Sequence, residues 1–98
     1  MTKKTITVQV DFYAGVQAVF GTASTRATLA GSSRTVGAAL EAIAATRERR
    51  ETIFDPAGGL RRDLTVFKNG RNIKFIGGLE AELNEGDVLA LFPPTFGG

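Results

Sequence analysis

The chain ends in Asp87-Val88-Leu89-Ala90-Leu91-Phe92-Pro93-Pro94-Thr95-Phe96-Gly97-Gly98, and the rest of the sequence is organised around this stretch. Its first part is a short apolar strand. Pro93 and Pro94 have fixed φ angles and no backbone N–H, so they cannot extend a central strand and must lead the chain away from the sheet. Two glycines at the tip leave a slender end that carries a carboxylate. We predict a body, residues 1–92, and a flexible tail, residues 93–98, that reaches about 20 Å when extended.

Many chain ends are only frayed termini, and that is the simpler interpretation of the tail. Two prolines placed directly after a buried-looking strand favour the functional interpretation.

Length and composition restrict the chemistry. The 98 residues, 43% of them apolar, are enough for a single domain with one hydrophobic core. The sequence contains no Cys and no His, which removes thiolate nucleophiles, the usual zinc ligands and the commonest general base. We therefore expect no metal site and no bound cofactor, and no thiolate or imidazole chemistry from this chain.

Charge and hydropathy indicate which kinds of partner and which cellular compartment to expect. The net charge is only +2, and acidic residues lie between the basic ones, which favours a mixed solvated surface over a nucleic-acid-binding surface. A basic rim that faces an acidic partner remains an alternative. The N-terminus has no apolar signal core, and no run approaches the roughly 20 apolar residues of a membrane span. We expect a cytoplasmic protein without membrane contact.

The first half of the chain predicts two strands and a helix. Thr5–Tyr13 alternates apolar and polar residues, and Thr22–Leu29 is rich in β-branched residues, so the two should form an antiparallel pair. Between them, Ala14–Gly21 is expected to be a loop or a single helical turn. The one clear helix is Val36–Arg50, with Thr35 as its N-cap and an apolar stripe that the stem of Arg47 extends.

The second half predicts a hairpin and a central strand. Leu64–Phe67 is a third strand, and Asn69-Gly70 is a two-residue turn before a short return strand that ends near Ile73. In the final strand Leu89 and Leu91 face the helix, while the other face shows Val88, Ala90 and Phe92. An outward Phe92 beside the tail indicates a partner surface.

The order of these elements predicts the fold. We expect an α+β protein with a mixed sheet of four to five strands and one main helix packed on one face. The last, apolar strand should lie centrally and parallel to the first. That arrangement is the β-grasp, the fold of ubiquitin.

The sequence also resembles a known family. Gly86–Pro94 followed by Gly97-Gly98, and the internal segment Leu64–Ile73, are similar to the ubiquitin-like sulfur-carrier proteins of the MoaD and ThiS type. Their best match is the small subunit of molybdopterin synthase, and the likeness covers nearly the whole chain. At Thr95-Phe96 the sequence departs from the family, which commonly has two small residues there.

The resemblance implies a carrier rather than an enzyme. A ubiquitin-activating-type adenylyltransferase would use ATP and Mg to adenylate the Gly98 carboxylate. A sulfurtransferase or cysteine desulfurase would then supply the sulfur of a Gly98 thiocarboxylate. The tail would enter an acceptor enzyme such as the molybdopterin synthase large subunit, with contacts from the segment that comprises Phe92, Pro93, Pro94, Thr95, Phe96 and Gly97.

Several functions share this terminal chemistry. Molybdopterin synthesis, for the molybdenum or tungsten cofactor, is the pathway that the resemblance favours, and sulfur transfer for thiamine, cysteine or tRNA thiolation is an alternative. A modifier that is joined to lysines through Gly98 is another. A β-grasp interaction module whose tail has no chemistry is the third class.

Overall fold

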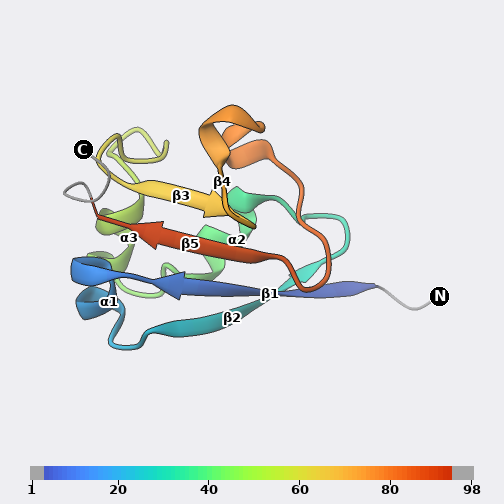
Figure 1. The fold of residues 1–98 in the computed structure, drawn as a ribbon, viewed down its shortest axis with the longest axis horizontal. Helices are drawn as coiled ribbons and strands as arrows, with labels where there is room; N and C mark the ends of the chain where they lie inside the picture. The colour runs from blue at the N-terminus through green and yellow to red at the C-terminus, as the bar shows by residue number, and fades with distance from the viewer. Residues whose placement is uncertain (1–3, 94–98) are drawn as a thin grey trace.

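The computed structural model describes residues 4–93, which form a five-stranded mixed sheet in the order β2-β1-β5-β3-β4 (Figure 1). β5 is the central strand and runs parallel to β1, as predicted, and it pairs with β3 in the antiparallel direction. The order and the parallel central pair are those of the β-grasp. The strands are β1 (Thr5–Phe12), β2 (Ser24–Ala30), β3 (Thr65–Lys68), β4 (Arg71–Asn72) and β5 (Val88–Phe92).

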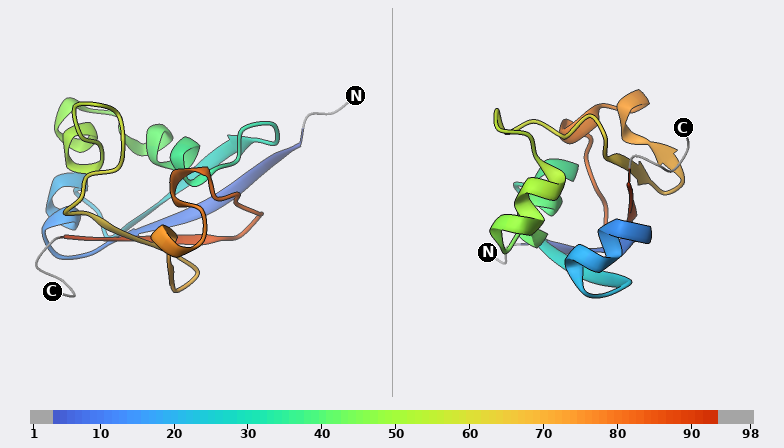
Figure 2. Two further views of the ribbon diagram at one scale, coloured as in Figure 1. Left: turned by 90° about the horizontal axis from the view of Figure 1, so that it is seen from above. Right: turned by 90° about the vertical axis from the view of Figure 1, so that its left-hand side faces the viewer.

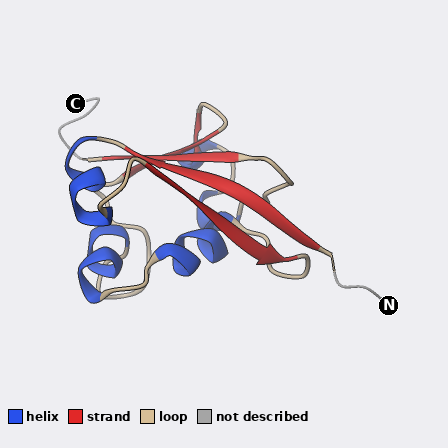
Figure 3. Ribbon diagram, turned by 90° about the horizontal axis from the view of Figure 1, so that it is seen from below, coloured by secondary structure: helices blue, strands red, loops and turns tan. Residues whose placement is uncertain are grey.

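Helices pack on one side of this sheet, and the other side is left open (Figures 2 and 3). The face toward the helices is apolar because β1 and β5 alternate, and every second side chain is buried. The helical elements are α1 (Ala14–Phe20), α2 (Val36–Ile43) and α3 (Arg47–Ile53), with the short 3-10 helices η1 (Ile73–Phe75) and η2 (Gly78–Glu80).

The prediction of one helix over Val36–Arg50 is wrong, because the segment forms two helices. α2 ends at Ile43, and Ala44 adopts φ −83° and ψ 62°, outside the helical region. Thr46 then begins α3 by accepting a hydrogen bond from the backbone N–H of Arg49 at 3.2 Å. Arg47, expected to extend the apolar stripe, instead exposes 91% of its side chain.

The break has a physical cause in the contacts of α3. The Arg49 guanidinium donates to the carbonyl of Phe20 at 3.1 Å and lies over the Phe20 ring, 5.4 Å from its centroid. Arg50 forms two hydrogen bonds, of 2.7 and 2.8 Å, with the Glu41 carboxylate on α2. The turn at residues 44–46 therefore directs α3 toward α1 while it stays tied to α2.

The segment from Ala14 is also more ordered than predicted. It is a seven-residue helix rather than a loop or a single turn, and it ends at Gly21 in the left-handed conformation, φ 73°. Val16 and Phe20 anchor it, and the Phe20 ring stacks on Phe12 with centroids 4.2 Å apart. Burial of two side chains of this size contributes roughly 1.5–3 kcal/mol each, enough to order a short helix.

Local signals in the sequence predicted two other features well. Thr35 caps α2 by accepting a hydrogen bond from the backbone N–H of Ala38 at 3.1 Å. Asn69 and Gly70 have φ angles of 50° and 84°, the left-handed pair that a tight hairpin turn requires. Within residues 4–93, no helix is both long and apolar enough to cross a membrane.

Candidate functional site

β5 leads directly into the tail, and it is hydrogen-bonded to β1 on one side and to β3 on the other. The N–H of Gln9 donates to the carbonyl of Asp87 at 2.9 Å, and the N–H of Tyr13 donates to the carbonyl of Leu91 at 3.1 Å. Pro93 follows directly and is half-buried. The predicted tail residues beyond it lie outside the described residues: Pro94, Thr95, Phe96, Gly97 and Gly98.

A second anchor fixes the start of β5. The side-chain carbonyl of Asn69 accepts a hydrogen bond from the N–H of Val88 at 2.9 Å, and its amide group donates to Asp87 at 3.0 Å. The backbone N–H of Asn69 also donates to the carbonyl of Val88 at 2.8 Å. The hairpin turn therefore sets the register of β5, and with it the point at which Pro93 leaves the sheet.

Three aromatic rings meet on the open face of the sheet beside Pro93. Phe92 stacks on Tyr13, with centroids 4.6 Å apart and planes 12° from parallel, and contacts the edge of Phe67 with centroids 5.5 Å apart. Tyr13 is 42% exposed, while Phe67 and Phe92 are half-buried. We call these three residues the aromatic cluster.

The aromatic cluster confirms the predicted outward direction of Phe92 and adds two residues that the sequence analysis did not assign to the site. Tyr13 follows the alternation of Thr5–Tyr13 onto the outer face, so its direction was readable. Its partner was not, because the pairing of β1 with β5 joins opposite ends of the sequence.

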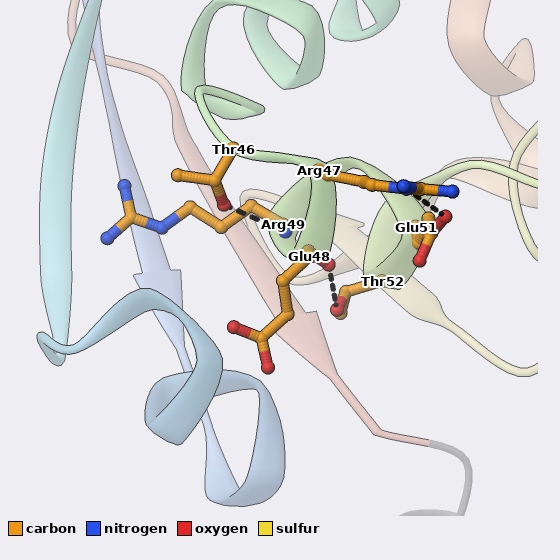
Figure 4. A network of polar contacts seen from close by, with 6 residues as sticks. All are labelled: Thr46, Arg47, Glu48, Arg49, Glu51 and Thr52. Carbon is orange, nitrogen blue, oxygen red and sulfur yellow. Dashed lines mark hydrogen bonds and ion pairs between the residues drawn. The ribbon is translucent and has the colours of Figure 1, made fainter.

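A cleft of about 430 Å³ lies at the root of the tail on the side toward the helices. Pro93 lines it, together with Val16 of α1, Glu48 of α3 and Asp63 of the loop before β3. In Figure 4 the carboxylate of Glu48 extends away from α3 toward α1, whereas Glu51 is turned to Arg47, at 3.2 Å. The same figure shows the Thr52 hydroxyl donating to the carbonyl of Glu48 at 2.8 Å. Pro93, where the tail begins, thus has charged side chains on one side and the aromatic cluster on the other.

One ion pair stiffens the wall of this cleft. Arg61 donates two hydrogen bonds of 3.0 Å to the carboxylate of Asp63. These bonds lower the pKa of Asp63 below its ordinary value and raise that of Arg61, so both groups are charged at neutral pH. The pair is about half exposed, and water and salt therefore screen it.

The described residues contain no group of three or more acidic side chains placed to hold a metal ion, and the sequence has no His or Cys. What the body offers is a rigid strand, an aromatic surface beside its end and a defined exit for the chain.

A family model decides the relationship of this chain to known proteins. The model described as the ThiS family matches residues 10–98. The chain belongs to the ThiS family.

Individual relatives agree with this family assignment. A candidate sulfur carrier protein from Archaeoglobus fulgidus is 38% identical over 48 residues, which are 49% of this chain and 54% of that protein. The chain thus spans about half the length of that relative.

Solved structures of other proteins share the β-grasp fold. The crystal structure of SAMP1 from Haloferax volcanii has a TM-score of 0.80 and 31% identity, covering 94% of this chain and 99% of that chain. A structure of the Amycolatopsis orientalis BexX/CysO complex has a TM-score of 0.76 and 26% identity, covering 93% and 99%. These likenesses group the ThiS family chain with small sulfur carriers and ubiquitin-like modifiers.

Proposed function

We propose that this chain is a sulfur carrier whose reactive group is the Gly98 carboxylate. A carboxylate is a poor electrophile because oxide is a poor leaving group. Attack of the Gly98 carboxylate on the α-phosphate of ATP, with Mg bound to the nucleotide, would release pyrophosphate and form an acyl-adenylate on a ubiquitin-activating-type enzyme. The persulfide sulfur of a sulfurtransferase or cysteine desulfurase would then displace AMP to form an acyl disulfide. Attack of a second thiol on the enzyme-side sulfur of this disulfide would release the Gly98 thiocarboxylate.

The observation that supports the proposal is the place where the chain leaves the sheet at the end of β5. The central strand of this ThiS family domain ends at Phe92, within the aromatic cluster, and the sequence beyond it ends in Gly97-Gly98. A partner that covered Tyr13, Phe67 and Phe92 would lie directly next to the start of the tail. Binding energy from the rings would then hold the glycines at the partner's site.

A partner surface of this kind has support in a relative. CysO of Amycolatopsis orientalis has been crystallised in complex with BexX. For the present chain we propose two kinds of partner in the cytoplasm, the activating enzyme and an acceptor enzyme, each of which takes the tail into a buried site. That site would have to be wide enough to admit Phe96, which is far bulkier than its sequence neighbours Thr95 and Gly97.

The pathway that we favour is synthesis of the molybdenum or tungsten cofactor. Gly86–Pro94 and Leu64–Ile73 resemble the small subunit of molybdopterin synthase, and the structure joins these two segments as neighbouring strands. The acceptor would then be the large subunit, and sulfur would pass from the Gly98 thiocarboxylate to the pterin precursor.

Conjugation to lysine is a second candidate, favoured by the likeness to a small archaeal modifier protein over 94% of this chain. It uses the same acyl-adenylate, with a lysine amine in place of sulfur as the nucleophile. Both uses can coexist, because they diverge only after activation.

Intact-mass measurement separates these functions. The chain is incubated with ATP, Mg, the cognate activating enzyme and a sulfur donor. Replacement of one oxygen by sulfur in the unmodified chain supports the carrier, and covalent bands on other proteins support the modifier. Deletion of Gly98, or one residue added after it, should abolish both products, whereas Arg26→Ala on β2 should not. If neither product forms with the native chain, the proposal is wrong.

A further inference from the structure

A groove of about 600 Å³ opens at the β3–β4 edge of the sheet, away from the aromatic cluster. Its floor is aliphatic and is made by core residues, among them Leu64, Val66 and Ile73, each at most 6% exposed. Arg62 and Lys74 form its rim from opposite sides. We call this the basic groove.

The groove exists because β4 is short. β4 pairs with β3 only at Phe67 and Lys68, and the chain then turns away into η1. The preceding loop, which carries Leu60 and Arg62, diverges on the other side. Among the described residues, Thr65 and Val66 of β3 therefore have no strand partner on this side, and the half-buried Leu60 and Leu79 border the gap. In Figure 1 the yellow-green loop lies at the start of β3, and the orange segment lies near the other end of this strand, beside β4.

The charge of the groove is one-sided. Of its three cationic lining residues, Arg61 is already bonded to Asp63. Over residues 4–93, Arg62 and Lys74 make no ion pair, and no carboxylate lines the groove. Two uncompensated cations above an aliphatic floor are complementary to a ligand that combines carboxylates with aliphatic side chains.

One large apolar side chain is exposed next to the rim residue Lys74. Phe75 follows Lys74 on η1 and is 80% exposed, the most exposed of the large apolar side chains over residues 4–93. Phe75 does not itself line the groove, and single exposed rings are common on protein surfaces, so the apolar part of the site is its aliphatic floor.

We propose that the basic groove binds a short segment of a partner protein in which aliphatic residues alternate with Asp or Glu. The aliphatic side chains pack against the half-buried Leu60 and Leu79, and the carboxylates pair with Arg62 and Lys74. A nucleic acid fits less well, because its bases need aromatic rings to stack on and the described residues that line the groove include none. The site adds a contact that is independent of the tail and its chemistry.

The test is a titration of the 15N-labelled full chain with a capped peptide of alternating leucine and glutamate, followed by amide chemical shifts. Saturable shifts should appear at Leu64, Val66 and Ile73. A leucine–lysine peptide and a serine–glutamate peptide should not produce them, since the first has the wrong charge and the second lacks the aliphatic groups. Added salt should weaken the binding.

Two double variants make the test specific to the rim. Arg62→Glu with Lys74→Glu should reduce the affinity roughly tenfold or more, because attraction becomes repulsion. Arg26→Glu with Lys4→Glu makes the same change in charge on the β1–β2 side and should leave the affinity within roughly twofold. The inference is overturned if the native chain shows no saturable shifts, if they centre on Tyr13 and Phe67, if the leucine–lysine peptide binds equally well, or if both variants behave alike. Failure of the Gly98 chemistry would not affect this result.

Discussion

Tyr13 and Phe92 lie ring on ring on the open face of the sheet, with centroids 4.6 Å apart and planes 12° from parallel. One residue directly follows the first strand, and the other ends the last strand. They meet because β1 and β5 run parallel, with Phe12 opposite Leu91. The ring contact therefore links the start of α1 to the end of β5. A substitution in either ring should change the position at which Pro93 leaves the sheet.

The first prediction concerns this ring pair. Tyr13→Ala should lower the free energy of unfolding by about 1 kcal/mol, since an aromatic pair of this geometry contributes that much. Urea denaturation measures the loss. Tyr13→Phe keeps the stacking and should unfold at nearly the native urea concentration. An equal loss in both variants would show that the hydroxyl, not the ring contact, stabilises this end of the sheet.

A second prediction concerns the turn that sets the register of β5. Asn69→Gly removes the side-chain bonds to Val88 and Asp87 while keeping the left-handed backbone, and should cost about 1–2 kcal/mol. Asn69→Ala loses the same bonds and also places a Cβ at φ 50°, so it should cost about 1 kcal/mol more. Thermal or urea unfolding of both variants gives the two contributions separately. Equal stabilities would mean that the backbone relaxes at this turn.

The cap of α3 gives a third prediction. Thr46 accepts the Arg49 N–H at 3.2 Å, so Thr46→Ala should destabilise the chain by about 1 kcal/mol. Thr46→Ser keeps an oxygen in place and should recover most of the loss. Hydrogen exchange should show the effect first in the amides of Arg49 and Arg50. Uniform exchange across the whole chain would instead indicate global destabilisation without local fraying.

A fourth prediction concerns pH. The hydrogen bonds from Arg50 lower the pKa of Glu41 below its ordinary value of 4.5, despite a small opposing effect of burial. A lowered folded-state pKa means that the pair stabilises the protein above 4.5 and that this contribution is lost as the pH falls through the lower value. Glu41→Gln should therefore lower Tm at neutral pH and have a smaller effect at acidic pH, below the ordinary value of 4.5.

The control for this experiment is Glu82→Gln, which removes an exposed carboxylate that lies outside the helices and has no ion-pair partner in the described chain. Its Tm should follow the native value at both pH values. The effect at Glu41 should be small, because both partners are about half exposed and water screens their attraction. A Tm loss that persists at low pH would contradict an electrostatic origin.

Much of the fold could be predicted from local signals. The alternation in Thr5–Tyr13, the Asn69-Gly70 turn and the Thr35 cap each depend on residues a few positions apart, and the structure has them where the sequence predicts. The break at Ala44 was not predicted because no Gly or Pro marks it. Its cause lies in contacts of Arg49 with Phe20 and of Arg50 with Glu41, which no local pattern contains.

The candidate site divides in the same way. The outward direction of Phe92 follows from the strand period alone. The tail chemistry, from Pro94 to Gly98, rests on the sequence and its family, since these residues lie outside the described part of the structure.

By itself, the sequence determined the strands, their buried faces, the hairpin turn and the glycine end, because backbone preferences and side-chain periodicity act over a few residues. Only the tertiary structure decided that Tyr13, Phe67 and Phe92 share one surface, that α3 turns toward α1, and that a short β4 leaves the basic groove open. Each of these depends on which distant strands pair and where the pairing stops, and that choice is made by burial of the whole core at once.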